Sequence, residues 1–464
     1  MNRGRSYITS VGLTAAGLSL IAPAVAQEVS GLTATFGIKQ SIEASDNLDL
    51  TDPPVAGARG TTELSFGLVS ETSTSRLAFN TAGQFEFGEG DTGFTDPSAN
   101  ISYSTTSRNS RLTTLASYSE SDVNSLTTVF ASTGGFGLDE QLVIGTGTRL
   151  NTSANLQFET GIDAPLGFIF DASYRMLDFR DTTDPGLFKT ERLTYGATMR
   201  MRVNAAVTMR LGFELEDYEA QDDVNTMRDN ARVFWEADYD IRSDLTATTR
   251  LSFDRNETTT TGFTSGFGLT ASQSTSTDEG FGGGFAITKT LQNGTIGADF
   301  DTRVTSDGRR DTVRLTRAID LPRGDFSLTV GAAKTNTSDL QPLVDMTYNQ
   351  DVPRGRLTLG LSQRVSIGDD DESQINTRLR AEYNEEINQN SSWGVSALLA
   401  DTDAIDLDDD SRRLDLGVDY RRELTRDWDM VANYTYSMAE ESGDAARTSN
   451  TVTLSIEKAF QFKP

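Results

Sequence analysis

The sequence contains no cysteine and no histidine among its 464 residues. Their absence excludes a disulfide framework, zinc-finger spacing, haem-type ligation and the Ser-His-Asp or Cys-His machinery of many hydrolases. A pair of carboxylates can still cleave glycosides, but acidic residues are so widespread here that the sequence nominates no pair. We therefore expect no metal site, no cofactor and no enzymatic activity.

Positive charge and long apolar runs are also scarce. Lysine and arginine number 41 against 68 acidic residues, which gives a formal net charge of -27. A strongly acidic chain is a poor partner for nucleic acid, because phosphate binding needs a basic surface. Beyond the amino-terminal segment no stretch of about 18 apolar residues occurs, so membrane-spanning helices are excluded. The remaining classes are a soluble protein and a β-barrel whose apolar residues are diluted by alternation.

The amino-terminal segment has the order of features found in a secretory signal peptide. Arg3 and Arg5 form a basic start, an apolar stretch follows, and a small-x-small pattern ends at Ala26. The alternative is a buried amino-terminal helix. We expect a signal peptide at 1–26 and a single mature domain at 27–464, exported by a Gram-negative bacterium.

Alternation of apolar and polar residues is the dominant pattern in the rest of the chain. Between Arg192 and Val203 the odd-numbered residues are apolar and the even-numbered residues are polar, charged or glycine. Similar alternation recurs at 207–216, 233–241 and 414–421. A strand places successive side chains on opposite faces, so each segment predicts a strand with one apolar face and one charged face.

Short polar turns interrupt the alternation, and longer acidic segments lie between them. The turns fall near Ser73, Asn109, Pro165, Asn204, Ser243, Asn293, Pro322, Pro353, Asn390 and Arg426. The acidic segments include Asp217–Asp229, Asp369–Glu372 and Asp401–Asp410. Short periplasmic turns and long extracellular loops are typical of outer-membrane β-barrels.

Counting strands around these turns predicts an all-β fold, a single closed antiparallel transmembrane β-barrel of about 22 strands, within a range of roughly 16 to 24. The range reflects Asp122–Thr148 and Glu257–Glu279, which are each either a hidden hairpin or a large loop that partly plugs the lumen. A β-sandwich is disfavoured, because a sandwich of this size would divide into domains joined by linkers, and no linker is visible.

The polar faces of the predicted strands carry many charged residues that we expect to face the lumen. They are Arg192, Arg200, Arg202, Arg210, Glu214, Glu216, Glu236, Asp238, Arg250, Arg378, Arg380, Asp415, Asp419 and Arg421. They form either a ladder of solvated cross-strand ion pairs or a charged constriction that selects solutes. The early strands are instead neutral, as at Asn80 and Asn100. A lumen with one charged and one neutral wall suits polar, sugar-like solutes.

Aromatic residues on the apolar faces predict girdles at the membrane interfaces. They are Trp235, Tyr239, Trp393, Tyr420, Trp428, Tyr434 and Tyr436. We therefore expect outer-membrane lipid and lipopolysaccharide as partners. The acidic segments at 369–372 and 401–410 are either a solvated rim or loose sites for divalent cations that bridge to lipopolysaccharide, and they lack the spacing of an EF-hand.

The carboxyl-terminal hairpin carries a resemblance to a known family. It reads Tyr420-Arg421-Arg422-Glu423-Leu424-Thr425-Arg426-Asp427-Trp428, followed by Asn433-Tyr434-Thr435-Tyr436. This hairpin resembles those of outer-membrane β-barrel porins associated with exopolysaccharide production and export. The resemblance implies a barrel that passes polysaccharide. The terminal strand, Thr451 to Phe462, looks like the signal that the barrel-assembly machinery recognises, although Lys463-Pro464 follow the terminal aromatic residue.

These patterns predict a porin-like channel for passive passage or export of polar solutes or polysaccharide. The leading alternative is a structural or surface-adhesive barrel with an occluded lumen. A TonB-type receptor is disfavoured, because the alternation starts near Leu32 and leaves no room for a plug domain before it. A β-solenoid adhesin is disfavoured because the spacing between turns varies.

Overall fold

The computed structural model describes residues 31–88, 92–123, 147–182, 186–266, 268–305, 308–335, 340–367, 373–404 and 410–463. The predicted signal peptide at 1–26, the acidic segment Asp369–Glu372 and most of Asp122–Thr148 lie outside these ranges.

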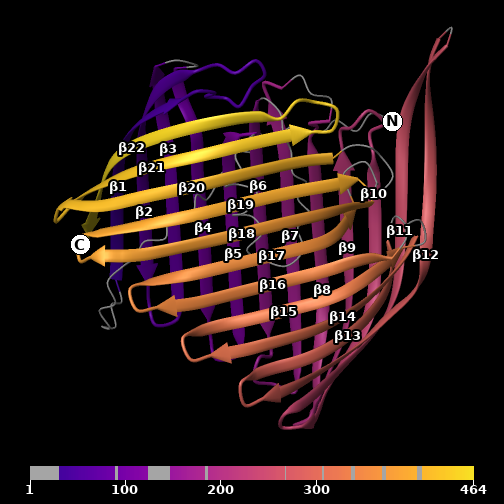
Figure 1. Cartoon of the computed structure of the whole chain (residues 1–464). Helices are drawn as coiled ribbons and strands as arrows, with labels where there is room; N and C mark the ends of the chain where they lie inside the picture. Colours follow the sequence, from indigo (N-terminus) through magenta and orange to yellow (C-terminus); the bar gives the residue numbers. More distant parts are fainter. Residues whose placement is uncertain are drawn as a thin grey trace.

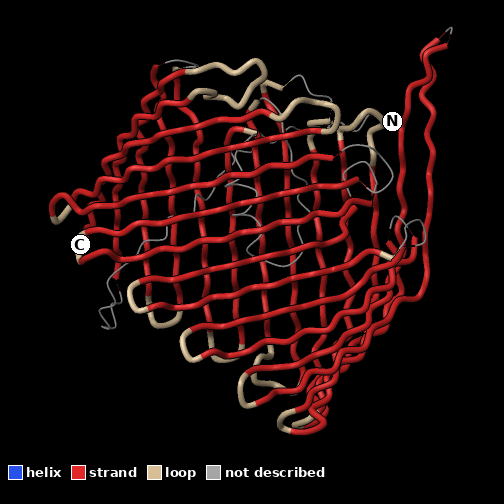
Figure 2. Tube along the Cα trace, viewed as in Figure 1, coloured by secondary structure: helices blue, strands red, loops and turns tan. Residues whose placement is uncertain are grey.

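The described residues form one closed antiparallel β-barrel of 22 strands and no helix, as the alternation predicts (Figures 1 and 2). The strands are β1 (Gly31–Ser45), β2 (Gly57–Glu71), β3 (Ser75–Gly88), β4 (Gly93–Thr106), β5 (Ser110–Asp122), β6 (Thr148–Thr160), β7 (Leu166–Arg180), β8 (Thr190–Asn204), β9 (Val207–Ala220), β10 (Met227–Arg242), β11 (Leu245–Gly266), β12 (Gly268–Leu291), β13 (Gly294–Thr305), β14 (Gly308–Leu321), β15 (Gly324–Thr335), β16 (Gln341–Val352), β17 (Gly355–Ile367), β18 (Ser373–Asn388), β19 (Ser391–Ala404), β20 (Asp410–Thr425), β21 (Trp428–Glu441) and β22 (Arg447–Phe462). Each strand pairs with its neighbours in sequence, and β22 pairs with β1.

All ten predicted short turns are confirmed, and they lie at one end of the barrel, which we call the short-turn end. Each predicted position falls within, or directly beside, a connection between an even-numbered strand and the next one. At the β12–β13 turn, Asn293 is followed by Gly294, whose φ is +118°. A Cβ there would lie 2.2 Å from the carbonyl oxygen of Ala318, so this tight turn requires glycine.

The opposite end, which we call the loop end, differs from the expectation at one segment and decides between two alternatives at another. The segment Asp217–Asp229 is mostly strand, because β9 continues to Ala220 and β10 begins at Met227. The segment Glu257–Glu279, for which the sequence left a hairpin and a plugging loop open, is part of a hairpin. It belongs to β11 and β12, which form a long hairpin that rises beyond the neighbouring strands (Figure 1). Its threonine-rich sequence explains this extension, since β-branched residues favour paired strands.

Side chains on the two faces of the sheet differ sharply in chemistry. The convex face exposes apolar residues, such as Val233 at 56% and Leu251 at 58%. The concave face carries polar and charged residues, and Glu236 and Asp254 are buried there. An apolar outside and a polar inside reverse the arrangement of a soluble protein and exclude a packed sandwich core. A closed β-barrel of this kind satisfies its backbone within a bilayer, and it is the fold of outer-membrane proteins. The chain is therefore an outer-membrane β-barrel.

No helix in the described part of the chain is long and apolar enough to cross a membrane.

The barrel closes at a seam between the first and last strands. The register runs from Ala34 opposite Phe462 to Ser45 opposite Thr451. At the loop end the seam is clasped by side chains, because the backbone N–H of Asn450 donates to Asp46 Oδ1 at 2.7 Å and Asn47 Nδ2 donates to the Thr448 carbonyl at 3.0 Å. The terminal strand thus supplies both an apolar outer face and the closing hydrogen bonds.

Candidate functional site on the inner wall

Opposite charges meet across strands on the inner wall of β8 to β11, which we call the laddered wall. The register places Arg210 directly opposite Glu236, and Glu236 directly opposite Arg250. Four positions along, it places Glu214 opposite Arg232, and Arg232 opposite Asp254. Directly opposed residues share one face of an antiparallel sheet and have their Cβ atoms about 5 Å apart, so these rows can form ion pairs.

Glu236 is the centre of one charge network. Its Oε1 accepts a hydrogen bond from Arg210 Nη1 at 2.5 Å, and its Oε2 accepts one from Arg250 Nε at 2.9 Å. Arg210 also donates to Asp238 at 2.5 Å, and Asp238 accepts from the Thr248 hydroxyl at 2.8 Å. Because Glu236 is buried between two guanidinium groups, its carboxylate ties β9, β10 and β11 together.

A second network lies four positions nearer the loop end. Arg232 Nε donates to Asp254 Oδ1 at 2.6 Å, and the Ser252 hydroxyl donates to Asp254 Oδ2 at 2.9 Å. Arg232 also lies 3.9 Å from Glu214. Asp254 is 2% exposed, so its charge is held by these partners and not by water.

Arg200 lies opposite another arginine and finds its partners elsewhere. The register places it opposite Arg210, which would be unfavourable. Arg200 instead forms an ion pair with Glu159 and donates to the carbonyls of Gly161 and Ile162 at 2.9 and 3.2 Å. Arg202, at the short-turn end, is exposed and has no ion pair with any described residue.

Nearer the loop end, two guanidinium groups flank one aromatic ring. The Arg192 and Arg228 Cζ atoms lie 5.3 and 4.8 Å from the centroid of the Tyr218 ring, which is buried. Arg192 is also 3.9 Å from Glu216, which accepts from Asn230 Nδ2 at 2.9 Å. The cation–π contacts stabilise both arginines beside the ring.

Phe234 is a second aromatic residue among the charged rows of the inner wall, after Tyr218. Its ring lies across Gly212, since a Cβ at Gly212 would be 2.5 Å from Phe234 Cζ. Arg250 Cζ lies 6.0 Å from the ring centroid. The candidate residues derived from the sequence omitted Phe234. The sequence signal that could have identified it is an aromatic residue at a position where the alternation places polar residues.

A cavity of about 450 Å³ lies against this ring on the inner wall. The side chains that line it from the inner faces of β5 to β10 are mainly amides, hydroxyls and carboxylates, and they include Asn155, Gln157, Asp171, Ser173, Thr194, Thr198, Glu214 and Phe234. Gln157 Nε2 donates to Asp171 Oδ1 at 2.9 Å, which orients both side chains. One aromatic face beside several hydrogen-bonding groups is an arrangement that can contact a polar solute with an apolar side, such as a sugar ring.

The remaining predicted charged residues lie on β18 to β20, which we call the second wall. Strands β12 to β17 separate it from the laddered wall. Here the partners are mostly neighbours within one strand, because Arg380 donates to Glu382 at 2.7 Å and Arg413 lies 3.5 Å from Asp415. Arg421 reaches Glu457 on β22. The other two predicted residues here, Arg378 and Asp419, share this inner face.

The middle of the inner face of β3 to β6, which we call the neutral wall, carries uncharged polar residues, in line with the sequence pattern. The register aligns Asn80, Asn100, Ser117 and Ser153 in one inner row. The hydroxyls of Ser117 and Ser153 are 2.6 Å apart.

The seven aromatic residues proposed for the membrane interfaces all lie on the outer, apolar face. Trp393, Tyr420 and Trp428 lie near the short turns, and Tyr239 is half exposed there. Trp393 packs edge-on against Tyr383 with ring centroids 5.6 Å apart. The other members of the set, Trp235, Tyr434 and Tyr436, lie near the middle of their strands and not at the ends.

Among the described residues, no group of three or more acidic side chains is placed to hold a metal ion. Asp401 accepts a hydrogen bond from Arg412 Nε at 2.8 Å, so its carboxylate is paired with a guanidinium group.

The sequence matches no family model, and no curated protein is similar to it in sequence. Solved structures do share its fold. The ferric-catecholate import receptor Fiu from E. coli K12 superposes with a TM-score of 0.57 at 11% identity, covering 94% of this chain and 82% of that one. The siderophore receptor PiuA from Acinetobacter baumannii gives 0.58 at 9% identity, with 92% and 82% covered. The FrpB iron transporter from Neisseria meningitidis gives 0.54 at 12% identity, with 92% and 81% covered. Similarity at these identities establishes the outer-membrane barrel fold and nothing finer.

Proposed function

We propose that this barrel is a porin-like channel through which polar solutes pass without catalysis. The observation that carries the proposal is the inner-wall cavity beside Phe234, where an aromatic ring, amides and carboxylates face the lumen. A wholly structural barrel has no need of an aromatic residue held on its polar face, since burying that ring against membrane lipid would be more favourable.

The charge arrangement supports a channel that discriminates by charge and hydrogen bonding. Carboxylates on the laddered wall are matched by arginines, so the wall is strongly polar without a large excess of either sign. Fixed pairs of opposite charge order water and favour solutes rich in hydroxyl groups over simple ions. The neutral wall of β3 to β6 adds hydroxyl and amide groups.

Exopolysaccharide export is the sharper form of this proposal. Two features support it, the resemblance of the β20–β21 hairpin to exopolysaccharide-associated porins and the Phe234 cavity, where a ring can stack against a sugar. Deletion of the gene should reduce surface polysaccharide. Unchanged surface polysaccharide in the deletion strain would remove the export proposal and leave the porin-like channel standing.

Single-channel conductance of the purified full chain in planar bilayers tests the channel itself. We expect current steps, and we expect neutral linear maltooligosaccharides to interrupt the current. Phe234→Ala should weaken this interruption several-fold, whereas Phe253→Ala, which removes an aromatic side chain from the outer face of the adjacent strand β11, should not. A bilayer that stays silent at all voltages would overturn the proposal and favour a structural barrel with an occluded lumen.

A second candidate function follows from the fold comparisons. The solved structures named above are described as import receptors or transporters for iron or its chelates, and their barrels match this one along most of its length. An import receptor would bind its ligand tightly and conduct little current. A silent bilayer combined with micromolar or tighter binding of a ferric catecholate would favour this candidate over a channel.

A further inference from the structure

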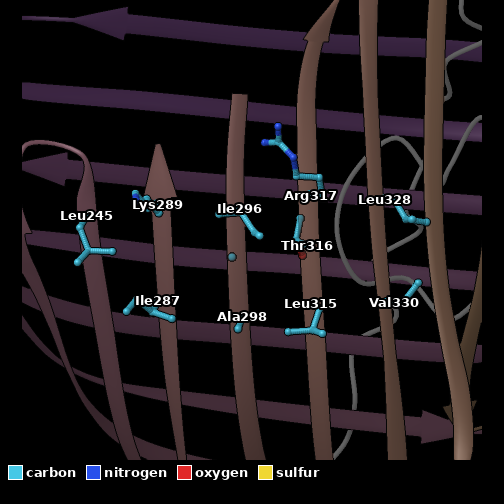
Figure 3. Close-up of a pocket in the computed structure, with 11 residues that line it drawn as sticks. Leu245, Ile287, Lys289, Ile296, Ala298, Leu315, Thr316, Arg317, Leu328 and Val330 are labelled. Atoms are coloured by element: carbon cyan, nitrogen blue, oxygen red, sulfur yellow. The ribbon is translucent and has the colours of Figure 1, made fainter. Parts of the chain in front are cut away.

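An apolar hollow of about 430 Å³ lies on the outer face of the barrel, over β11 to β15, near the short-turn end (Figure 3). It is separate from the inner-wall cavity, because its lining side chains follow the outward alternation of these strands. An apolar cavity of roughly 150 Å³ holds one benzene molecule, so this hollow accommodates a longer hydrocarbon segment.

The register explains why the sheet is hollowed here. One outer row contains Ile287, Ala298, Leu315 and Val330, which lie directly opposite one another on consecutive strands. Ala298 is the smallest of these side chains and lies between Ile287 and Leu315 (Figure 3). A small residue between larger aliphatic neighbours leaves a depression with an apolar floor.

Two cations border the hollow on its short-turn side. The next outer row contains Lys289, Ile296 and Arg317 in register, so the two cations stand on either side of Ile296 (Figure 3). Strands are spaced about 4.8 Å apart, so the Lys289 and Arg317 backbones are separated by about 10 Å. Both side chains are long enough to reach one anionic group that lies over Ile296.

The positive charge in this row is not neutralised by any described residue. Arg317 donates only to neutral groups, namely the Thr295 and Ala318 carbonyls at 2.9 and 2.8 Å and Asn293 Oδ1 at 3.0 Å. Lys289 is exposed and forms no ion pair in the described part of the chain. The nearby carboxylates Asp320 and Asp325 alternate onto the inner face.

Another outward-facing lysine at the short-turn end provides a contrast. Lys458 lies 3.6 Å from Asp427 and sits over the rings of Trp428 and Phe460 at 5.4 and 4.6 Å. Its charge is therefore matched within the protein, and aromatic rings fill the space around it. Lys289 and Arg317 have an apolar hollow instead of rings and no carboxylate.

We propose that this hollow is a binding site for one anionic phospholipid of the leaflet that faces the short turns. The phosphate lies between Lys289 and Arg317, and one acyl chain follows the row of Ile287, Ala298 and Leu315 towards the membrane centre. Charge complementarity selects an anionic headgroup, and the shape of the hollow selects an acyl chain.

Native mass spectrometry of the full chain released from detergent micelles tests the proposal. The probes are phosphatidylglycerol and the zwitterionic phosphatidylethanolamine at equal concentration. We expect one phosphatidylglycerol to be retained in preference to phosphatidylethanolamine. Lys289→Gln should lower that retention at least fivefold, and Ala298→Leu, which fills the hollow without changing charge, should lower it by a similar factor.

Matched controls separate site loss from general effects. Lys458→Gln removes an outward lysine outside the hollow, and Ala237→Leu adds the same volume to the outer face of β10. Both should retain phosphatidylglycerol as the unmodified chain does. Each variant is first shown to be folded by its heat-modifiable mobility on gels. Equal retention of the two lipids, unchanged retention in Lys289→Gln, or equal losses in the controls would each overturn the proposal.

Discussion

The laddered wall of β8 to β11 and the second wall of β18 to β20 share a sequence pattern but differ in the contacts that their charged side chains make. Both alternate apolar and charged residues, and both are rich in arginine and carboxylates. On the laddered wall the register sets Glu236 opposite both Arg210 and Arg250. On the second wall it sets Arg380 opposite Leu398, and Asp419 opposite Gly394, so most charges find partners along their own strands, and Arg421 is the exception that reaches Glu457 on β22.

The difference shows that alternation determines which face a residue occupies, while register determines which residue it meets. A carboxylate bridging two strands links backbone segments that are far apart in sequence. A carboxylate two positions from its arginine links nothing beyond its own strand. Similar composition therefore yields a cross-strand network in one region and mostly local pairs in the other.

The largest expected effect comes from placing a charge on the outer face of the barrel. It should be similar behind the laddered wall and behind the second wall, because both outer faces are apolar. Leu211→Arg on β9 and Val418→Arg on β20 each place a charge in the apolar band, where both native side chains are about half exposed. Each change should destabilise the barrel by roughly 2–4 kcal/mol, if the site lies near the membrane midplane. Urea unfolding in lipid vesicles measures this loss. Thr208→Arg, which points inward, should be tolerated, and equal harm from all three would contradict the assigned faces.

A smaller effect should separate the two walls. Glu236→Gln removes the carboxylate shared by Arg210 and Arg250, whereas Glu382→Gln removes the partner of Arg380 alone. Glu236 is buried and its partners are partly exposed, so its loss should cost about 1–3 kcal/mol, while the Glu382 pair is partly solvated and should cost about 0–1 kcal/mol. The measurement is the urea concentration at the unfolding midpoint, compared between the two variants in the same lipid vesicles. Equal losses would mean that cross-strand bridging adds nothing.

Much of this structure follows from the amino-acid sequence because its signals are local. Alternation depends on neighbouring residues, and turns such as Asn293-Gly294 carry their own conformational preference. The strand number and the facing of the charged residues rest on these signals. Register is not local, since it sums weak preferences over whole strands. The opposition of Arg200 to Arg210, and the rescue of Arg200 by Glu159, therefore could not be read from the chain.

The sequence left two features open for other reasons. Phe234 interrupts the polar face of its strand, and only the structure shows that Gly212 opposite leaves room for the ring. The extension of β11 and β12 could be a hairpin or a loop, because its glycine, serine and threonine residues lack an apolar face. Strand pairing needs backbone hydrogen bonds and β-branched residues, and it does not need that face outside the membrane.

Replacing one glycine on each wall should also affect the laddered wall more than the second wall. Gly212→Ala drives a Cβ into the rigid Phe234 ring, whereas Gly394→Ala meets the carboxylate of Asp419 and the amide of Asn384, which can rotate away. We expect Gly212→Ala to cost about 1 kcal/mol, at the lower end for overpacking, and Gly394→Ala to cost less. The same urea experiment tests both, and the weaker effect of maltooligosaccharides on the Gly212→Ala current gives a second readout. A larger loss for Gly394→Ala would reverse the comparison.

The smallest expected effect concerns the seam at which β22 pairs with β1. Hydrogen bonds from the Asn450 backbone N–H and side-chain amide lower the pKa of Asp46, which lies beyond the end of β1. A carboxyl whose pKa is lower in the folded state stabilises that state above its unfolded value, and this contribution fades as the pH falls through the folded value. Seam stability should therefore drop slightly below about pH 4. Asp46→Asn should remove this pH dependence while leaving the stability of the laddered wall unchanged. Hydrogen exchange of the β1 and β22 amides at pH 3 and pH 6 measures the difference, and identical pH profiles in the two chains would show that the Asp46 clasp contributes nothing to closure.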